Sequence, residues 1–252
     1  CYLAVIVLLV VITYLVQTTY NTTVNGLPLK PALAAKCKIV LLPLDSRPPC
    51  TQFVKQLGSI AGIEVVLPPT AFLDNYKTPA NREALRQWLL NATADAEAAI
   101  IAVDMLVHGG LLASRIANGD AADVAATLSL LEELNKRYPQ LKIYAFNIIP
   151  RLLLADNSSY ANFRHQVLEY SVLQDLVYTF ENPRDIDRLE QLQREIPPSL
   201  IDTYRSLYEN TANISLALIS LVEKGVITSL VLGQDDSQPF GIPNITVRKF
   251  EN

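Results

Sequence analysis

Five short apolar runs recur along the chain, and each is a candidate strand. They are Lys38–Leu44, Ile63–Leu67, Ala98–Val103, Lys142–Ile149 and Ile227–Leu232. Their apolar residues are continuous rather than alternating, and many are β-branched, which is typical of strands that are buried on both faces. The pattern therefore predicts five strands of a parallel sheet.

Helical periodicity separates the first four of these runs. Apolar residues three or four positions apart occur in three sets: Phe53, Val54, Leu57 and Ile60; Leu85, Trp88 and Leu89; and Val124, Leu128, Leu131, Leu134 and Tyr138. Such spacing places each set on one face of a helix. Strand and helix thus alternate, which predicts right-handed βαβ crossovers and an α/β domain.

The stretch from Tyr160 to Lys224 departs from this rhythm because it is long and has a helical pattern throughout. Asn182-Pro183 and Pro197-Pro198 interrupt it, and proline ends helices because it lacks the N–H and clashes with the preceding turn. We therefore expect a helical insertion of two or three helices, at about residues 160–224, before the fifth strand.

The number of strands limits the architecture. A (β/α) barrel needs eight parallel strands, whereas an open sheet needs fewer. Because the pattern predicts five, the domain is either part of a barrel or a smaller open sheet. Of the two, we expect part of a (β/α) barrel-like domain over residues 37–252.

The N-terminal run Cys1–Val16 is apolar and uncharged. With Gln17–Tyr20 at the interface, it approaches the length of about 20 residues that spans a bilayer. Residues 21–36 are polar or proline-containing, the layout of a linker after a signal anchor, although a buried core helix is the alternative. The pattern predicts a transmembrane or signal-anchor segment at residues 1–20 and a single-pass membrane or exported protein.

Composition narrows the classes of function. Half of the 252 residues are hydrophobic and the formal net charge is −4. Because no basic cluster is present, the chain lacks the electrostatic footprint of a nucleic-acid-binding protein. The cysteines Cys1, Cys37 and Cys50 have no metal-ligand spacing, and we expect free thiols. We predict no cofactor and no metal site, and the oligomeric state stays open.

Polar side chains follow four of the predicted strands, at the carboxyl ends where parallel α/β folds bind ligands. Because those ends meet at one edge of a sheet, we expect the side chains to form a single rim. The candidates are Asp45, Arg47, Asp104, His108, Ser114, Arg115, Asn147, Arg151, Gln234, Asp235 and Asp236.

The adjacent carboxylates Asp235 and Asp236 are the candidates for catalysis. Neighbouring carboxylates repel, so one can stay protonated near neutral pH as a general acid while the other is ionised. The alternative is a strand-end turn, where Asp is common. In the same way, Asp45 could serve only to pair with Arg47, and Gly109-Gly110 could serve only a backbone turn.

Three motifs at this rim carry a resemblance to a known family. They are Leu42–Pro48, His108–Arg115 and Gly233–Asp236. Together they resemble an uncharacterised, mainly bacterial family, the domain of unknown function 4127 family, over residues 37–247. Its members are typically about twice this long, so the resemblance implies the N-terminal half of the domain. The resemblance implies that the three motifs form one site, but it implies no established reaction.

Two classes of function follow from the rim. The first is a glycosidase-like hydrolase of envelope or extracellular carbohydrate, in which Asp235 or Asp236 is the general acid, its neighbour orients the substrate or stabilises positive charge, and the other rim residues bind the substrate. The second is a non-catalytic protein that binds a sugar or an anionic ligand through Arg47, Arg115 and Arg151.

Two weaker alternatives remain. A metal-assisted hydrolase would use Asp45, Asp104 and Asp235, although their spacing is not that of zinc ligands. A membrane-tethered structural partner would expose an apolar stripe on the helical insertion, and this function would leave the polar rim unexplained. We therefore expect the hydrolase.

Overall fold

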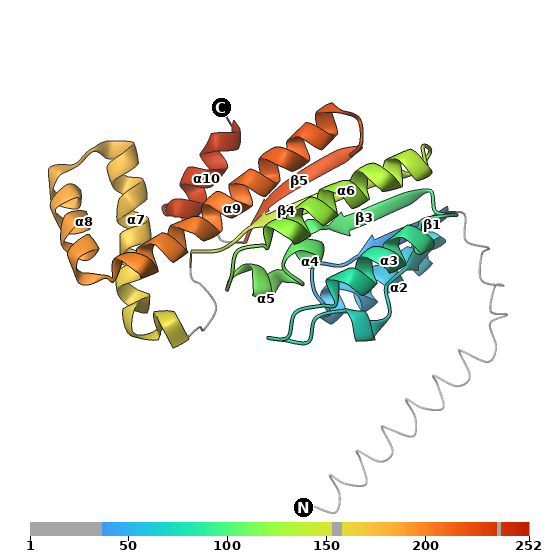
Figure 1. The fold of residues 1–252 in the computed structure, drawn as a ribbon, viewed down its shortest axis with the longest axis horizontal. Helices are drawn as coiled ribbons and strands as arrows, with labels where there is room; N and C mark the ends of the chain where they lie inside the picture. Colours follow the sequence, from blue (N-terminus) through green and yellow to red (C-terminus); the bar gives the residue numbers. More distant parts are fainter. Residues whose placement is uncertain (1–36, 153–157, 236–237, 252) are drawn as a thin grey trace, which may run out of the picture. The chain divides into compact units, whose positions relative to one another are not determined.

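The computed structural model describes residues 37–152, 158–235 and 238–251. Five strands form one parallel sheet in the order β2-β1-β3-β4-β5 (Figure 1). Their bounds are β1 Cys37–Leu42, β2 Ile63–Val66, β3 Ala98–Ala102, β4 Lys142–Ile149 and β5 Ser229–Gln234. The predicted parallel α/β sheet is confirmed.

Helices connect these strands. They are α2 (Gln52–Ala61), α3 (Arg82–Ala92), α4 (Val103–Val107), α5 (Leu111–Ser114), α6 (Ala121–Arg137), α7 (Arg164–Phe180), α8 (Pro183–Glu195), α9 (Pro198–Glu223) and α10 (Ile242–Glu251). Short 3₁₀ turns are η1 (Pro48–Cys50), η2 (Thr70–Phe72) and η3 (Ser158–Phe163).

Four strands differ from the prediction at one or both ends, and β1 and β5 do so for local reasons. β1 ends at Leu42 rather than Leu44, because Pro43 has no N–H to donate to a sheet ladder. β5 begins at Ser229 rather than Ile227. Just before it, the Thr228 hydroxyl accepts the N–H of Ile143 at 3.1 Å, so a side chain takes the place of a ladder bond there.

The strand order contradicts the barrel-like expectation. In a (β/α) barrel each strand lies beside the next one in the sequence. Here β1 lies between β2 and β3, and β2 and β5 are the edges of the described sheet. The described residues therefore form the alternative, a smaller open sheet. The reversal after β2 creates a switch point at the carboxyl ends of β1 and β3, where open α/β sheets bind ligands.

One face of the sheet is covered by helices and carries the main core. Side chains with no exposed surface from the strands, such as Leu42 and Ile101, meet Leu85 of α3, Leu131 of α6 and Leu218 of α9. The fully buried α4 contacts α3, α6 and β4 within the same layer. Burial of apolar side chains is the dominant favourable term in folding, so this layer anchors the carboxyl ends of the strands.

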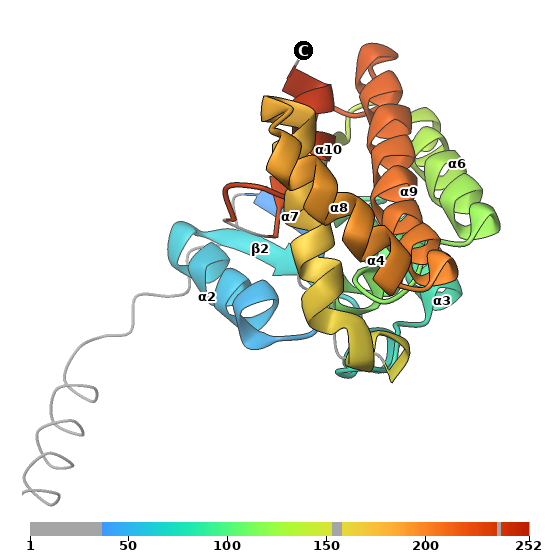
Figure 2. The same cartoon turned by 90° about the vertical axis from the view of Figure 1, so that its left-hand side faces the viewer.

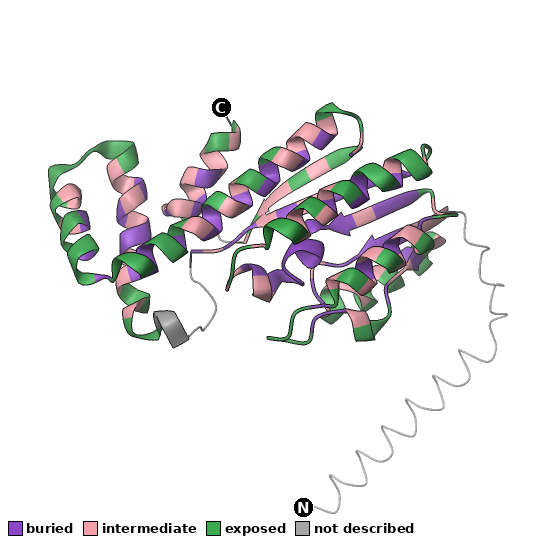
Figure 3. Cartoon of the chain, viewed as in Figure 1, coloured by how far each residue is buried: buried purple, intermediate pink, exposed green. Residues whose placement is uncertain are grey.

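The opposite face is covered by α2 near β1 and β2 (Figure 2). Gly58 allows this close packing, since a Cβ at that position would lie 2.4 Å from Cγ2 of Val65. The helix was predicted to bury one apolar face. Instead, Phe53, Leu57 and Ile60 are 51%, 65% and 83% exposed. Beyond α2 the sheet also exposes Tyr144 and Val231, so its two faces are unequally covered in the described residues. Figure 3 shows that β5 is coloured as intermediate or exposed rather than buried.

Three helices, α7, α8 and α9, lie between β4 and β5, where the helical segment was predicted (Figure 1). Proline opens both α8 and α9, and the Asn182 side chain caps α8 by accepting the N–H of Arg184 at 3.1 Å. A second core joins these helices, with Tyr170, Leu192 and Tyr204 fully or almost fully buried. The 26-residue α9 contributes to both cores.

A buried carboxylate attaches α10 to this helical group. Asp175 of α7 has no exposed surface, accepts the N–H of Gly241 at 2.8 Å and pairs with Arg248. Ser171, one turn earlier, accepts the N–H of Ile242 at 3.0 Å. These contacts satisfy free N–H groups at the start of α10. They fix the chain that follows β5.

No helix in the described ranges has both the length and the apolarity of a transmembrane span. The predicted membrane segment at residues 1–20 and the linker at residues 21–36 lie outside the described residues.

Candidate functional site

The turn after β1 contains a closed ion pair. Asp45 is 3% exposed. One carboxylate oxygen accepts the backbone N–H of Arg47 at 3.0 Å, and the other accepts Nε at 2.9 Å and Nη2 at 2.5 Å. Burial alone would raise the pKa of Asp45, but the hydrogen bonds from Arg47 outweigh it and hold that pKa below its usual value. Asp45 is therefore ionised at neutral pH.

Asp74 is a rim carboxylate that the sequence analysis missed. It is 9% exposed, and its Oδ1 accepts the N–H of Ser46 at 2.7 Å. Burial, together with the charge of Asp45, raises its pKa. Asp74 follows β2 but is separated from it by a loop that includes η2. A search of the carboxyl end of every predicted strand, rather than of four, would have found it.

The Gly109-Gly110 turn packs against that carboxylate. Both glycines have positive φ, 84° and 123°, which glycine adopts at little cost. A Cβ on Gly110 would lie 3.2 Å from Cγ of Asp74. The N–H groups of His108, Gly109 and Gly110 all donate to the carbonyl oxygen of Asp104, at 2.9, 3.1 and 3.3 Å. Because these amides already have acceptors, the turn is not an open cradle for phosphate.

Asp104, in the first turn of α4, is the most buried carboxylate of the rim at 1% exposure. Its Oδ2 accepts the N–H of Ile148 on β4 at 3.0 Å. Burial raises the pKa of Asp104 to about 7, and the charge of Asp235 adds to the increase, although the hydrogen bond from Ile148 opposes it. Asp104 therefore changes its protonation state near neutral pH.

Asp235 follows β5 and pairs with an arginine from the segment between β3 and β4. Arg115, which caps the C-terminus of α5, contacts its Oδ2 through Nε at 2.7 Å and Nη2 at 2.5 Å. The two side chains are 13% and 18% exposed, so solvent screens the pair only in part. The backbone N–H of Asp235 also donates to Ile149 at 3.1 Å. Asp236 lies outside the described residues.

Three predicted binding residues make their hydrogen bonds within the fold. Asn147 is buried and donates to the hydroxyl of Ser215 on α9 at 3.1 Å. Ser114 is buried and donates to the carbonyl of its own helix at 2.8 Å. Gln234 donates to Asn244 of α10 at 2.7 Å. The contacts of Asn147 and Gln234 join a strand to a helix, and that of Ser114 lies within α5.

His108 and Arg151 lie at different places on the domain. His108 is buried, its ring hydrogen-bonds to the backbone of Ala117, and its Nδ1 has no partner in the described part of the chain. Burial lowers its pKa to about 4, so the imidazole is neutral at physiological pH. Arg151 follows β4, and its carbonyl accepts the hydroxyl of Tyr208 on α9 at 3.1 Å.

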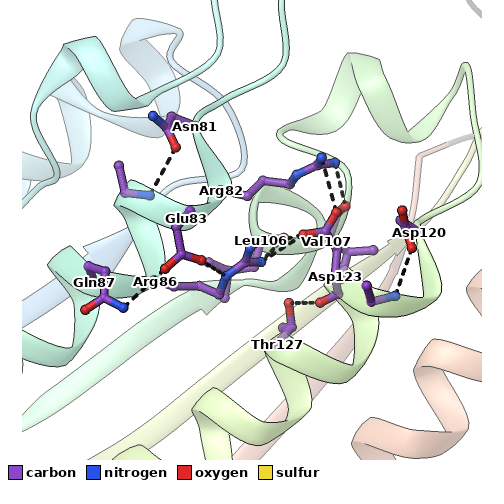
Figure 4. A network of polar contacts seen from close by, with 12 residues as sticks. Asn81, Arg82, Glu83, Arg86, Gln87, Leu106, Val107, Asp120, Asp123 and Thr127 are labelled. Carbon is purple, nitrogen blue, oxygen red and sulfur yellow. Dashed lines mark hydrogen bonds and ion pairs between the residues drawn. The ribbon is translucent and has the colours of Figure 1, made fainter.

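A charged network positions α4, which carries Asp104 (Figure 4). Arg82 donates to the carbonyl of Val107 at 3.2 Å, and Arg86 donates to that of Leu106 at 3.4 Å. Both arginines pair with Asp123 of α6 at 3.1 Å. Cations at a helix C-terminus satisfy its free carbonyls and complement its dipole. Sequence reasoning missed this network because arginines on a helix usually indicate only a solvated face.

The two cysteines of the described residues, Cys37 and Cys50, form no disulfide with each other. Cys37 and Cys50 are free thiols, as predicted, and they lie near opposite ends of β1. Burial raises the pKa of Cys50 to about 11, with a further contribution from the charge of Asp45. The thiolate is the reactive form, so Cys50 is unsuited to nucleophilic attack at neutral pH.

The rim thus divides into two clusters. The first cluster contains Asp45, Arg47 and Asp74, and its two carboxylates interact electrostatically. The second cluster contains Asp104, Arg115 and Asp235, in which Asp235 interacts with Asp104. Within the described ranges, no group of three or more His, Cys, Asp or Glu residues could hold a metal ion. The chemistry that this arrangement supports is proton transfer beside a fixed negative charge.

A family model described as "Protein of unknown function (DUF4127)" matches residues 39–252. No curated protein and no solved structure matches the chain.

Proposed function

The chain belongs to the DUF4127 family of proteins of unknown function, and from this premise we propose that it is a glycosidase-like hydrolase in which Asp104 transfers the proton and Asp235 stays ionised. The observation that carries the proposal is the second cluster, where the charge of an arginine-paired carboxylate acts on a deeply buried carboxyl group. Glycosidases commonly use such a pair of carboxyl groups with different protonation states.

Asp104 has the properties of a general acid. It is buried at the carboxyl edge of the sheet. The N–H of Ile148 donates to its Oδ2, and we propose that the proton for transfer is on Oδ1. A group with a pKa of about 7 is partly protonated at neutral pH, so it can both donate and accept a proton. In the proposed reaction Asp104 protonates the glycosidic oxygen of the leaving group.

Asp235 has the properties of the ionised partner. Arg115 contacts Oδ2 through two of its nitrogen atoms, and no described hydrogen bond uses Oδ1. In the proposed reaction Oδ1 faces the substrate. A fixed carboxylate stabilises the positive charge that develops on the sugar ring in the transition state. This assignment pairs Asp235 with Asp104, whereas the sequence analysis paired it with Asp236.

The charges of the rim favour a neutral substrate. Arg47 is already paired with Asp45, and Arg115 with Asp235. The charge of each guanidinium is therefore already balanced by a carboxylate, which weakens its attraction for an anionic ligand. Asp74, whose described hydrogen bond uses only Oδ1, offers an acceptor for a hydroxyl group instead. This distribution supports a carbohydrate rather than a phosphate or carboxylate ligand.

We further propose that the carbohydrate belongs to the cell envelope or the extracellular space. This step rests on the uncharged run Cys1–Val16 and the polar stretch that follows it. An anchored or exported hydrolase meets its substrate outside the cell membrane.

A non-catalytic sugar-binding protein is the second candidate. Asp104 lies in the first turn of α4, and its hydrogen bond with the N–H of Ile148 ties this turn to β4. Such a contact can serve a purely structural purpose. Under this alternative the same rim holds a sugar, but Asp104 transfers no proton.

The test compares hydrolysis of aryl glycosides and envelope polysaccharides by the wild type, by Asp104→Asn and by Asp235→Asn. Removing a general acid lowers the rate by about 100-fold to 10,000-fold. Asp95→Asn is the matched control, because Asp95 is 73% exposed and pairs only with Lys38 on the surface.

Two results would contradict the proposal. Turnover that survives Asp104→Asn assigns the proton to another group. Sugars that raise the melting temperature of the wild type without any turnover favour the binding protein, because a ligand stabilises the folded state without chemistry.

A further inference from the structure

A hollow of about 520 Å³ opens at the carboxyl end of β2, beside the first cluster. Its floor is apolar and includes Val65, Pro68 and Leu73. Ser46, which lies between Asp45 and Arg47 in the chain, forms part of the wall. The hollow is therefore separate from the second cluster but continuous with the rim.

The polar lining of the hollow combines donors and acceptors. Ser46, Thr51 and Thr70 contribute hydroxyl groups, and Lys55 and Glu64 contribute one charge of each sign. Such a lining suits a ligand with many hydroxyl groups and no net charge, since each hydroxyl both donates and accepts. The apolar floor suits the C–H surface of a sugar ring.

A hydrogen-bonded path links the hollow to the carboxylates. The N–H of Ser46 donates to Asp74 at 2.7 Å, and the Asp74 carboxyl group packs against Gly110. The charge of Asp45 acts on the same Asp74. A ligand that contacts Ser46 in the hollow would therefore lie next to the first cluster.

The strand order sets the distance from the hollow to the proposed catalytic pair. β2 is two strands from β3 and four from β5. Neighbouring strands lie about 4.8 Å apart, so the two separations are roughly 10 Å and 19 Å. More than one sugar ring is needed to cover them.

We infer that the hollow at β2 is a distal subsite that binds one sugar unit of an oligosaccharide chain whose scissile bond lies at the second cluster. The inference rests on the proposed function and extends it: the substrate is a chain of sugars rather than a single glycoside. Affinity then increases with chain length until the chain reaches β2.

The test fills the hollow and measures binding. Thr70 is exposed on η2 and lines the hollow, whereas its exposed neighbour Ala71 does not. Thr70→Tyr therefore fills the space, and Ala71→Tyr is the matched control. Each is made in the full chain with Asp104→Asn, which prevents turnover during the measurement. The probes are length series of cello-oligosaccharides and chito-oligosaccharides, measured by isothermal titration calorimetry.

We expect the affinity of the parent to rise with chain length in one of the two series. Thr70→Tyr should weaken binding of the longest oligosaccharide about tenfold and leave the shortest unchanged. Ala71→Tyr should change neither. Lys55→Met provides a second variant with the same expected pattern, and melting curves show that each protein is folded.

The outcomes separate this inference from the proposed function. Affinity that does not depend on chain length, no binding of either series, or equal effects of Thr70→Tyr and Ala71→Tyr would overturn the subsite. If the wild type hydrolyses aryl glycosides under those conditions, the proposed function still stands. If length-dependent binding is lost in Thr70→Tyr but nothing is hydrolysed, the subsite stands and the hydrolase fails.

Discussion

Each of the two clusters contains two aspartates and one arginine, but the most buried aspartate of each has its pKa shifted in the opposite direction. Asp45 and Asp104 are almost equally buried, at 3% and 1% exposure. The pKa of Asp45 is lowered, whereas that of Asp104 is raised to about 7. Asp45 has its own arginine two residues away, but Arg115 in the second cluster pairs with Asp235 instead. The comparison shows that the placement of each arginine, not burial alone, decides which carboxylate stays ionised.

The largest effect that we expect is a dependence of the free energy of unfolding on pH, caused by the raised pKa of Asp104. Because Asp104 has a higher pKa folded than unfolded, the folded protein binds more protons between about pH 4 and 7. The contribution of Asp104 to stability is therefore complete below pH 4 and is lost as pH rises to 7, by about 4 kcal/mol if the unfolded pKa is ordinary. Asp104→Asn should remove this fall in urea unfolding across that range. A variant with the slope of the wild type would show that Asp104 is not the titrating group.

The second largest effect concerns His108, which directly follows α4 and changes stability with pH in the direction opposite to Asp104. The pKa of His108 is lowered by burial to about 4, so the unfolded state binds more protons between about pH 4 and 6.5. Stability is present above pH 6.5 and is lost as pH falls toward 4, by about 3 kcal/mol. His108→Gln, which cannot titrate, should lack this loss. Between about pH 4 and 6.5 the two contributions oppose each other, so the stability of the wild type changes little with pH. Each single variant should therefore show a steeper dependence of stability on pH than the wild type.

The third effect follows from breaking the ion pair between Arg115 and Asp235 in the second cluster. Arg115→Met should leave Asp235 half-buried without its cation and cost about 1–3 kcal/mol in urea unfolding. The missing positive charge should also raise the pKa of Asp104 further, which moves the alkaline limb of the activity profile to higher pH. Arg188→Met, which breaks a more exposed pair with Glu169, is the control. An unchanged profile would indicate that Arg115 does not act on Asp104.

The smallest effect concerns the first cluster. Arg47 is 66% exposed, so water screens its pair with Asp45. Arg47→Lys keeps the charge but loses the two-pronged contact, and we expect a stability change of only about 0.5–1 kcal/mol in thermal unfolding. A loss as large as that of Arg115→Met would mean that the two clusters do not differ in the way we describe.

The sequence revealed which segments form the sheet but not how they are ordered. Continuous apolar runs located all five strands, and proline located the breaks between α7, α8 and α9. Strand order depends on which buried faces meet across long separations, and periodicity contains no information about that. The switch point, and with it the location of the site, therefore became visible only in the structure.

The candidate site was predictable to the extent that its contacts are local. Asp45 and Arg47 are two residues apart, and their pairing was among the alternatives considered from the sequence. Arg115 and Asp235 are 120 positions apart, and adjacency in the chain suggested Asp236 as the partner instead. Asp74 escaped detection because a loop separates it from β2.

Helix α9 has a consequence for how the domain opens. Its first half, with Tyr204 and Leu207, belongs to the core of the helical group, and its second half, with Ile214 and Leu218, belongs to the core under the sheet. Melting one half removes packing from one core, but the intact helical hydrogen bonds of the other half resist it. We therefore expect the amide protons along α9 to exchange in a single cooperative unit, so that the two cores unfold together.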